Sequence, residues 1–335
     1  MLKVRYLLVC VLIVLAGCRK GPPSQSEFVL GTVCSVSLYE QGRAEAYREI
    51  FGRFREIESR MSVTLPGTEL ERINANAGGA PVAVHPDVFE VIEAALRYAE
   101  LSGGAFDPTV GPLVSLWGIG GDNARLPSQE EIEGLLPLVN WRDVELDREG
   151  LTVFLKRPGM ALDLGAIAKG YAADEAAKIL LKHRIKRAII DLGGNILVYG
   201  EKRDRGAWRV GIQNPLDSRG AYIGIMEVRD QTVVTSGVYE RFFESGGARY
   251  HHILSPADGY PVRNGLLSVS IVTGRSVDAD ALSTAVFVLG YERGKVLVES
   301  LEGAGAVFIF EDKSIRVCGE AGFILTDESY RVAPE

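Results

Sequence analysis

Three short turns combine an acidic side chain with glycine and other small residues. They cover residues 106–111, 163–170 and 191–195. Small residues let a ligand approach the main chain closely, and free N–H groups at a helix N-terminus bind anionic phosphate. The second turn adds Lys169, a cation for the same anion. The alternative for that turn is an ordinary strand-to-helix corner with a surface lysine, and the spacing alone does not separate the two.

A carboxylate and a hydroxyl lie four residues apart near the start of a helix expected in the last quarter of the chain. Asp280 and Thr284 therefore share one helix face. Their oxygens suit Mg²⁺, a hard cation that leaves coordination positions for water and phosphate. The alternative is structural, because an aspartate in a first helical turn favours the helix dipole and a threonine can bond to its own backbone.

The adjacent histidines His251 and His252 occupy a segment that alternates like a strand. Alternation points the two rings to opposite faces, so at most one of them faces a given site. A structural role is the alternative for each. The sequence lacks GxSxG, HExxH, GxxxxGK[ST] and a GxGxxG after a strand, so the enzyme classes that carry these motifs are not indicated.

The composition favours one large or two ordinary globular domains and disfavours nucleic-acid binding. The chain has 335 residues, of which 47% are hydrophobic and 24% charged, enough to bury a sizeable core. Its 37 Lys and Arg residues against 44 Asp and Glu residues give a net charge of −7. Binding to nucleic acid without help needs a basic surface instead.

The N-terminal segment has the pattern of an export signal. Lys3 and Arg5 precede an apolar run over residues 7–15, which is too short to span a bilayer permanently. Residues 15–18 read Leu-Ala-Gly-Cys and resemble the bacterial lipobox. We therefore expect a lipoprotein signal peptide over residues 1–17, acyl chains such as palmitate on Cys18, and a tether over residues 18–26. The alternatives are an ordinary signal peptide with a chance cysteine, or a buried N-terminal helix.

Such a lipid anchor would hold the protein to a membrane of the bacterial cell envelope, on its periplasmic side. Cys34 and Cys318 are the cysteines left after Cys10 in the signal and Cys18. Free buried thiols and a disulfide between them are both compatible with the sequence, since the sequence does not show how close they lie.

The elements that must position these residues follow from the periodicity. We expect helices over residues 47–61, 86–101, 278–289 and 291–301, another that follows the 163–169 turn and ends near His183, and a short one opened by a capping box of Ser128 and Glu131. Strands are expected over residues 27–39, 188–191 and 196–199, repeatedly within 208–273, and at 306–310 and 323–325. Segregated helices and strands predict an α+β domain over residues 27–335, with largely antiparallel sheets in two lobes that share one sheet system.

Taken together, the motifs resemble the ApbE family, the FAD:protein FMN transferases. The matching stretches lie in family order at residues 30–32, 61–74, 106–118, 163–171, 191–195, 208–215, 234–241, 250–261 and 279–284. The resemblance implies a T-shaped α+β fold that holds FAD in a cleft, with Mg²⁺ at the pyrophosphate.

The resemblance also implies a role for individual residues. Ala166 would offer a backbone oxygen to the metal, Asp280 and Thr284 would offer side-chain oxygens, and Ser283 is a further candidate. His252 falls where a base near the phosphate is expected. The expected FAD contacts are Leu30, Thr64, Ala105, Phe106, Asp107, Asp163, Lys169 and Ile253.

The implied reaction moves FMN from FAD to a Ser or Thr hydroxyl of an acceptor protein and releases AMP. The acceptor would be a flavoprotein subunit of an exported or membrane redox complex. If water attacks instead, the same site is an FAD pyrophosphatase; a lipoprotein that binds FAD without turnover is a third alternative. Many family members carry Tyr where this chain has Thr64. A threonine cannot stack on a flavin ring, which leaves the balance of transfer and hydrolysis open.

Overall fold

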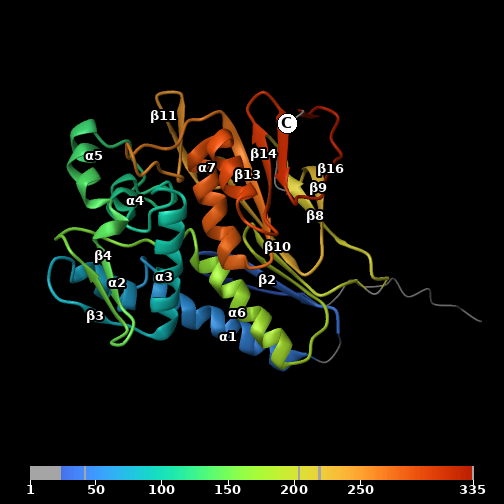
Figure 1. Cartoon of the computed structure of the whole chain (residues 1–335), viewed down its shortest axis with the longest axis horizontal. Coiled ribbons are helices and arrows are strands. Elements are labelled where there is room, and N and C mark those ends of the chain that lie inside the picture. The colour runs from blue at the N-terminus through green and yellow to red at the C-terminus, as the bar shows by residue number, and fades with distance from the viewer. Residues whose placement is uncertain (1–23, 41–42, 203, 218–219, 334–335) are drawn as a thin grey trace, which may run out of the picture.

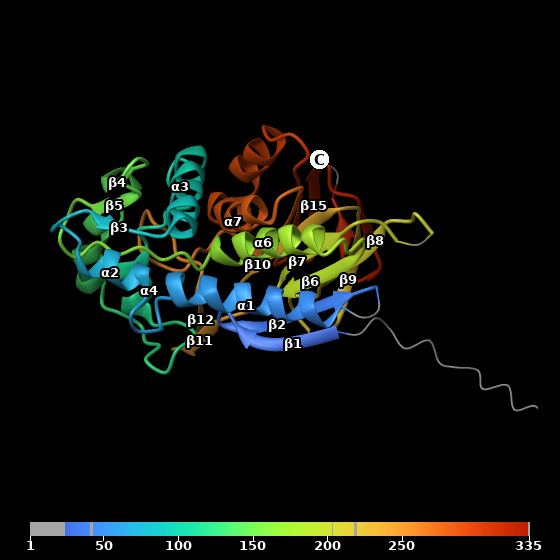
Figure 2. The same cartoon turned by 90° about the horizontal axis from the view of Figure 1, so that it is seen from below.

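The computed structural model describes residues 24–40, 43–202, 204–217 and 220–333. The expected signal peptide and Cys18 lie outside the described residues, and their role stays a prediction. None of the helices within the described ranges is both long and apolar enough to cross a membrane. Figures 1 and 2 show a larger lobe built on a long sheet and a smaller lobe beside it.

The larger lobe is built on a nine-stranded sheet in the order β1-β2-β6-β7-β10-β13-β14-β15-β17. Its strands are Ser24–Val29, Thr32–Leu38, Ala188–Leu192, Asn195–Tyr199, Gln231–Gly237, Leu266–Thr273, Gly305–Phe310, Ser314–Gly319 and Arg331–Val332. Every pairing in it is antiparallel except β15 with β17. The α+β class with largely antiparallel sheets is thereby confirmed.

Three helices cover one face of this sheet: α1 (Ala44–Met61), α6 (Ala168–Lys182) and α7 (Ser276–Glu299). The apolar residues of α1 recur every three or four positions, and Ile50, Phe54 and Ile57 are fully buried against the sheet. On the other face, β8 (Trp208–Gln213), β9 (Tyr222–Val228) and β16 (Phe323–Leu325) form a second sheet over a separate apolar cluster.

The smaller lobe has a sheet of its own, so the expectation that both lobes share one sheet system is wrong. That sheet joins β3 (Val82–Ala83), β5 (Thr152–Leu155) and β4 (Val144–Asp147). The helices around it are α2 (Glu69–Ala75), α3 (Pro86–Leu101), α4 (Gly111–Trp117) and α5 (Gln129–Leu135), with 3₁₀ turns at Leu136–Leu138 and Trp141–Asp143. The hairpin of β11 (Phe242–Ser245) and β12 (Ala248–His251) packs here through Phe243 and Tyr250 on Trp117.

The N-terminal strand expected over residues 27–39 is instead the hairpin of β1 and β2. Leu30 and Gly31 form its turn with φ values of 57° and 68°. Two consecutive left-handed residues are the mark of a tight hairpin turn, which normally carries Asn-Gly rather than Leu-Gly. Residues 24–26, expected in the tether, belong to β1 and pair with β2.

The C-terminal half follows the expectation with two corrections. The helices expected at 278–289 and 291–301 form one element, α7, with a kink at Gly290, where φ is 74°. Strands β15 and β17 were not expected from the sequence.

Cys34 on β2 and Cys318 on β15 are free and buried, and the sheet order places five strands between them. At about 4.8 Å per strand, this distance excludes a disulfide.

The N-terminal parts of α6 and α7 come into close contact at Gly170. A Cβ atom at this position would lie 2.7 Å from the Cα of Val277 and even closer to the carbonyl oxygen of Ser276. Glycine therefore allows the two backbones to touch, and the touching backbones fix where the first turn of α7 stands relative to that of α6.

Gly170→Ala should destabilise the fold, because the added methyl group must push the two helices apart. We expect a loss of about 1–3 kcal/mol in the free energy of unfolding, measured by urea denaturation. Gly134→Ala in α5 is the matched control, because its Cβ would meet nothing within 4 Å; it should be neutral or stabilising by up to about 1 kcal/mol. Equal stability of the two variants would contradict the close contact.

Candidate functional site

The N-terminus of α6 carries a buried carboxylate that comes from α7. Ile167 gives α6 no side-chain cap. Instead, Oδ2 of Asp280 accepts a hydrogen bond from the Gly170 N–H at 2.9 Å. In return, Asp174 of α6 accepts hydrogen bonds from the Ser276 and Val277 N–H groups of α7, at 2.7 and 3.0 Å. Each helix therefore caps the other, and Asp280, only 4% exposed, is fixed at the start of α6.

Lys169 lies against the second oxygen of that carboxylate. Its Nζ is 3.6 Å from Oδ1 of Asp280 and donates to the Gly165 carbonyl oxygen at 3.0 Å. The turn that the sequence singled out at residues 163–170 is therefore a cation-bearing turn at a helix N-terminus. Oδ1 of Asp280 is therefore only in a loose ion pair with Lys169, whereas Oδ2 accepts the hydrogen bond that caps α6.

The other expected metal ligands are close along the chain to these groups. Thr284 lies one turn after Asp280, and its hydroxyl has no hydrogen-bond partner among the residues that the structure describes. Ala166 lies in the turn before α6, beside the Gly165 carbonyl that Lys169 binds. Ser283 is committed elsewhere, since its hydroxyl bonds to Ser236 and to the Asp280 carbonyl oxygen.

This donor set fits a hard cation only in part. A carboxylate, a hydroxyl and a backbone carbonyl are the oxygen ligands that Mg²⁺ prefers. The set holds one carboxylate, and in the described part of the chain no three His, Cys, Asp or Glu residues cluster as metal ligands. Substrate phosphate and water would have to complete the coordination.

His252 is held as a neutral imidazole with one nitrogen available. Its Nδ1–H donates to the Arg241 carbonyl oxygen at 3.2 Å, which leaves the Nε2 lone pair unused by that contact. Burial, helped by the nearby cations Arg241 and Lys169, lowers the pKa of His252 to about 4. An imidazole in this state can accept a proton at neutral pH.

The neighbouring His251 has a structural role. Its Nε2–H donates to the Val262 carbonyl oxygen at 2.9 Å, and its Nδ1 accepts from the Ile253 N–H. The ring packs edge-on against Phe287. The two rings therefore have different partners, Val262 and Ile253 for His251 and Arg241 for His252.

Arg241 connects His252 to the β1–β2 turn, a role that sequence reasoning did not assign to it. Its carbonyl oxygen accepts from the His252 backbone N–H at 3.0 Å, and its guanidinium donates to the Gly31 carbonyl oxygen at 3.3 Å. Leu30, an expected FAD contact, is the other residue of that turn. No periodicity marks an arginine in the loop between β10 and β11, so only the fold reveals this position.

Asp163, another expected contact residue, is joined through its backbone to the turn of residues 106–109. The Asp163 N–H donates to the Pro108 carbonyl oxygen at 2.8 Å, and its Oδ1 accepts from the Gly165 N–H at 2.7 Å. Burial raises the pKa of Asp163 above its ordinary value, while Arg241 and Lys169 oppose this rise. The turn of residues 106–109 and the start of α6 therefore lie side by side.

Asp107 is turned into the protein. Its Oδ1 accepts from the N–H and hydroxyl of Thr109 at 2.8 and 2.6 Å, and its Oδ2 accepts from the Trp141 N–H at 3.1 Å. Burial raises the pKa of this carboxyl. Its carboxylate therefore shapes the turn, and a ligand would meet the backbone here. The adjacent Phe106 and the distant Ile253 are buried, whereas Ala105 is half-buried.

Thr64 is exposed in the loop between α1 and α2. Its hydroxyl bonds to the Ser62 hydroxyl at 3.0 Å, and its N–H donates to the same oxygen at 3.1 Å. Neither contact links it to Lys169, Asp280 or His252. Hydrogen bonds and an ion pair link Asp280 to Lys169, Asp163 to the 106–109 turn and His252 to the β1–β2 turn, and none of these contacts joins Thr64 to these groups.

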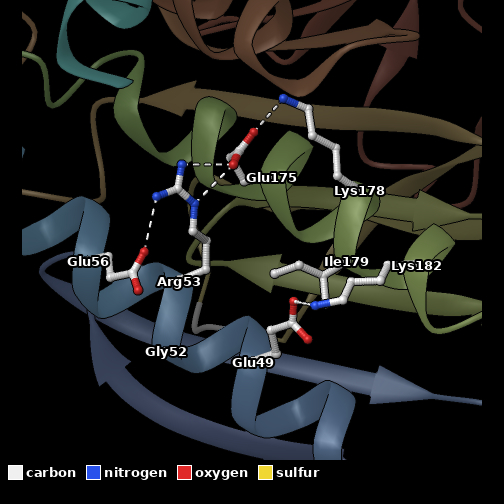
Figure 3. A pocket seen from close by; sticks show the side chains of 8 residues that line it. All are labelled: Glu49, Gly52, Arg53, Glu56, Glu175, Lys178, Ile179 and Lys182. Atoms are coloured by element: carbon white, nitrogen blue, oxygen red, sulfur yellow. Dashed lines mark hydrogen bonds and ion pairs between the residues drawn. The ribbon is translucent and has the colours of Figure 1, made fainter. Parts of the chain in front are cut away.

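A cavity of about 420 Å³ between α1 and α6 lies apart from these residues. Glu49, Arg53, Glu175, Lys178 and Lys182 line it, and Figure 3 shows their charges paired with one another. It contains none of the expected site residues. Because its cations are already neutralised by neighbouring carboxylates, it offers no uncompensated charge to a ligand.

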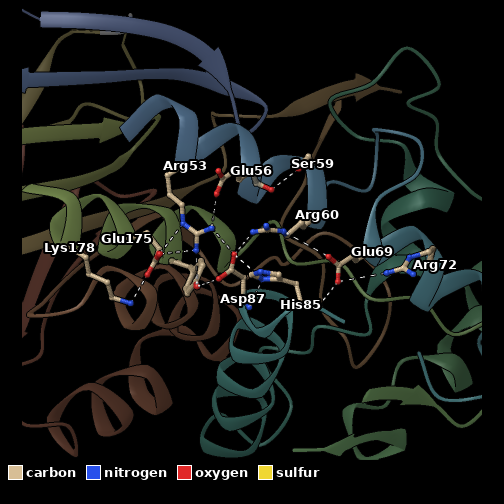
Figure 4. A network of polar contacts seen from close by, with 11 residues as sticks. Arg53, Glu56, Ser59, Arg60, Glu69, Arg72, His85, Asp87, Glu175 and Lys178 are labelled. Atoms are coloured by element: carbon tan, nitrogen blue, oxygen red, sulfur yellow. Dashed lines mark hydrogen bonds and ion pairs between the residues drawn. The ribbon is translucent and has the colours of Figure 1, made fainter. Parts of the chain in front are cut away.

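The wall of this cavity belongs to a polar network that ties three helices together (Figure 4). Arg53 of α1 bonds to Asp87 of α3 at 2.7 Å and to Glu175 of α6 at 2.8 Å. The Tyr171 hydroxyl donates to Asp87 at 3.0 Å. These hydrogen bonds raise the pKa of Arg53 above its usual range. Since Tyr171 follows Gly170, the network holds the end of α6 that carries the site.

Comparison with known proteins assigns the chain to a family. The sequence profile of the ApbE family matches residues 30–308. The chain belongs to the ApbE family. It is 43% identical to a FAD:protein FMN transferase of Treponema pallidum, over 92% of this chain and 91% of that protein, and 38% identical to one of Klebsiella pneumoniae, over 87% and 90%.

Solved ApbE structures share the fold. The ApbE protein of Thermotoga maritima superposes with a TM-score of 0.79 at 34% identity, covering 92% of this chain and 97% of that one. The flavin transferase ApbE of Vibrio cholerae superposes with a TM-score of 0.77 at 30% identity and the same coverage. The resemblance to this family and its fold is confirmed.

Arg53→Met should destabilise the ApbE fold, because it removes the cation that Asp87 and Glu175 share and leaves them with Arg60 and Lys178 respectively. We expect a loss of about 3 kcal/mol in the free energy of unfolding, measured by urea denaturation. Arg55→Met is the control on the same helix: Arg55 is exposed and forms its ion pair with the exposed Glu27, so its loss should cost less than about 1 kcal/mol. A small effect at both positions would show that the network contributes no stability.

The His252 imidazole should titrate near pH 4 rather than near its ordinary 6.5. NMR of the side-chain nitrogens measures this directly, with His252→Gln to assign the signal. Because the folded pKa lies below the unfolded one, the stability linked to this group is full above about pH 6.5 and falls as the pH drops toward about 4. A midpoint near 6.5 would mean that the ring is solvated.

Proposed function

We propose that this chain transfers FMN from FAD to a Ser or Thr hydroxyl of an acceptor protein and releases AMP, with Mg²⁺ at the scissile pyrophosphate. The observation that carries the proposal is the buried Asp280, held at the N-terminus of α6 beside Lys169. A helix N-terminus and a cation favour a phosphate, and a carboxylate in the same place favours a metal bound to that phosphate. The activity named for the relatives supports the substrate.

The cation site would consist of Asp280 Oδ1, the Thr284 hydroxyl and the Ala166 carbonyl oxygen. A bound Mg²⁺ would neutralise the pyrophosphate and polarise the phosphorus. Without a metal, Nζ of Lys169 lies on this same side of Asp280. A divalent cation at Oδ1 would repel the ammonium group, which is then available to bind a phosphate oxygen.

The transfer also needs a base that accepts the proton of the attacking hydroxyl. The acceptor oxygen forms a bond to the FMN-side phosphorus, and the bond from that phosphorus to the AMP oxygen breaks. The hydroxyl proton passes to Nε2 of His252, which the Arg241 carbonyl keeps in the required tautomer. Lys169 and Arg241 would stabilise the negative charge on the transferred phosphate.

Hydrolysis of FAD is the second candidate function, and the exposure of Thr64 favours it. With no aromatic ring at this position, the loop does not cover a bound flavin by stacking. Water could then replace the acceptor hydroxyl and yield FMN and AMP. Transfer and hydrolysis share the same cation site and the same base, and they differ in where the FMN is found afterwards.

Asp280→Asn should reduce AMP release from FAD on the order of 100-fold, because the amide removes the charge that holds the cation and keeps an oxygen to cap α6. The assay measures AMP by chromatography with Mg²⁺, with and without Ser/Thr-containing peptides, and protein- or peptide-bound flavin by fluorescence. Asp278→Asn is the matched control, because Asp278 lies two residues away in a pair with Arg97.

Full activity of Asp280→Asn at limiting Mg²⁺ would refute the metal assignment. Free FMN with no labelled peptide would assign hydrolysis instead of transfer. If the unmodified protein binds FAD tightly but releases no AMP, its function is to bind FAD without turnover. Circular dichroism of both variants ensures that lost activity does not reflect lost fold.

A further inference from the structure

A second cavity opens where the sheet of β8, β9 and β16 ends above the long sheet. It has a volume of about 350 Å³. Its floor is formed by β2, β6, β7 and β10, with Val33 and Asp191 among the lining residues. Its side is the strand β8, through residues 210–213. None of the expected FAD or metal contacts lines it.

The strand that borders this cavity is the edge of its sheet. The order β16-β9-β8 leaves β8 paired on one side only. Within the described part of the chain, no backbone group of residues 209–212 pairs with anything other than β9. An open edge with backbone groups free is the surface on which an extended peptide adds as a further strand.

The cavity leads to the proposed site. Thr32 lines it and follows Gly31, whose carbonyl oxygen accepts from the Arg241 guanidinium. Glu240 also lines it and precedes Arg241, whose carbonyl oxygen accepts from His252. The cavity and the proposed site therefore share the β1–β2 turn and the 240–241 segment, and a chain bound in the cavity would lie beside the elements that hold His252.

The charge of the lining selects the ligand. Asp191 and Glu240 are its charged residues, and no Lys or Arg lines it. A pyrophosphate would be repelled here, whereas the cations Lys169 and Arg241 attract it to the proposed site. The cavity suits an uncharged or basic polypeptide. Val33, which lines the cavity, is 55% exposed, and it pairs with Phe28 of β1, which is 77% exposed.

We infer that this cavity binds the acceptor protein as an extended, uncharged or basic segment that adds to the edge of β8 and presents its Ser or Thr hydroxyl to His252. The inference rests on the proposed function and names the form in which the acceptor arrives. FAD and the acceptor then occupy separate places that share the β1–β2 turn.

The test uses a library of dodecapeptides with one central Ser or Thr and randomised flanks, incubated with FAD, Mg²⁺ and the full chain. Labelled peptides are recovered by flavin fluorescence and sequenced by mass spectrometry. The unmodified protein should label peptides of zero or positive net charge. Val33→Lys should lower the labelling of basic peptides about tenfold and shift the products toward acidic ones, whereas Val33→Glu should enrich basic ones.

Val296→Lys is the matched control, because Val296 is 68% exposed on α7 and should leave the peptide spectrum unchanged. All three variants should bind FAD with unchanged affinity by calorimetry. The inference is overturned if both Val33 variants give the spectrum of the unmodified protein, or if that protein releases AMP but labels no peptide. If the unmodified protein neither binds FAD nor releases AMP from it, the proposed function itself is refuted.

Discussion

The contact between the first turns of α6 and α7 is the constraint on which the candidate site depends. Two helix N-termini would normally repel each other, since both carry partial positive charge. Here each is neutralised by an aspartate from the other helix, Asp280 for α6 and Asp174 for α7. Gly170 permits the approach because it has no side chain. A structural cap and a proposed metal ligand are thereby the same carboxylate.

This double use explains why so buried a charge is tolerated. Asp280 has a helix N-terminus on one oxygen and an ammonium group on the other, so its charge is compensated before any ligand arrives. The cation at Oδ1 is the weaker partner, at 3.6 Å. It is therefore the contact that a divalent ion can replace without disturbing the helix cap.

Features set by local sequence could be predicted, and features set by distant partners could not. The capping box of Ser128 and Glu131 and the helix Pro86–Leu101 follow from their own residues and occur as expected. The Leu30 turn was missed because leucine rarely adopts a positive φ. The inward orientation of Asp107 depends on Trp141, and the role of Arg241 depends on Gly31. Such partners are far apart in the sequence, so spacing does not reveal them.

The most direct test of the account is a crystal structure with FAD and Mn²⁺, in which anomalous scattering locates the metal. The account predicts one Mn²⁺ in contact with Oδ1 of Asp280, the Thr284 hydroxyl and the Ala166 carbonyl oxygen. It also predicts that Oδ2 remains on the Gly170 N–H and that Nζ of Lys169 has moved to a phosphate oxygen. A metal bound elsewhere, with Lys169 still paired to Asp280, would contradict it.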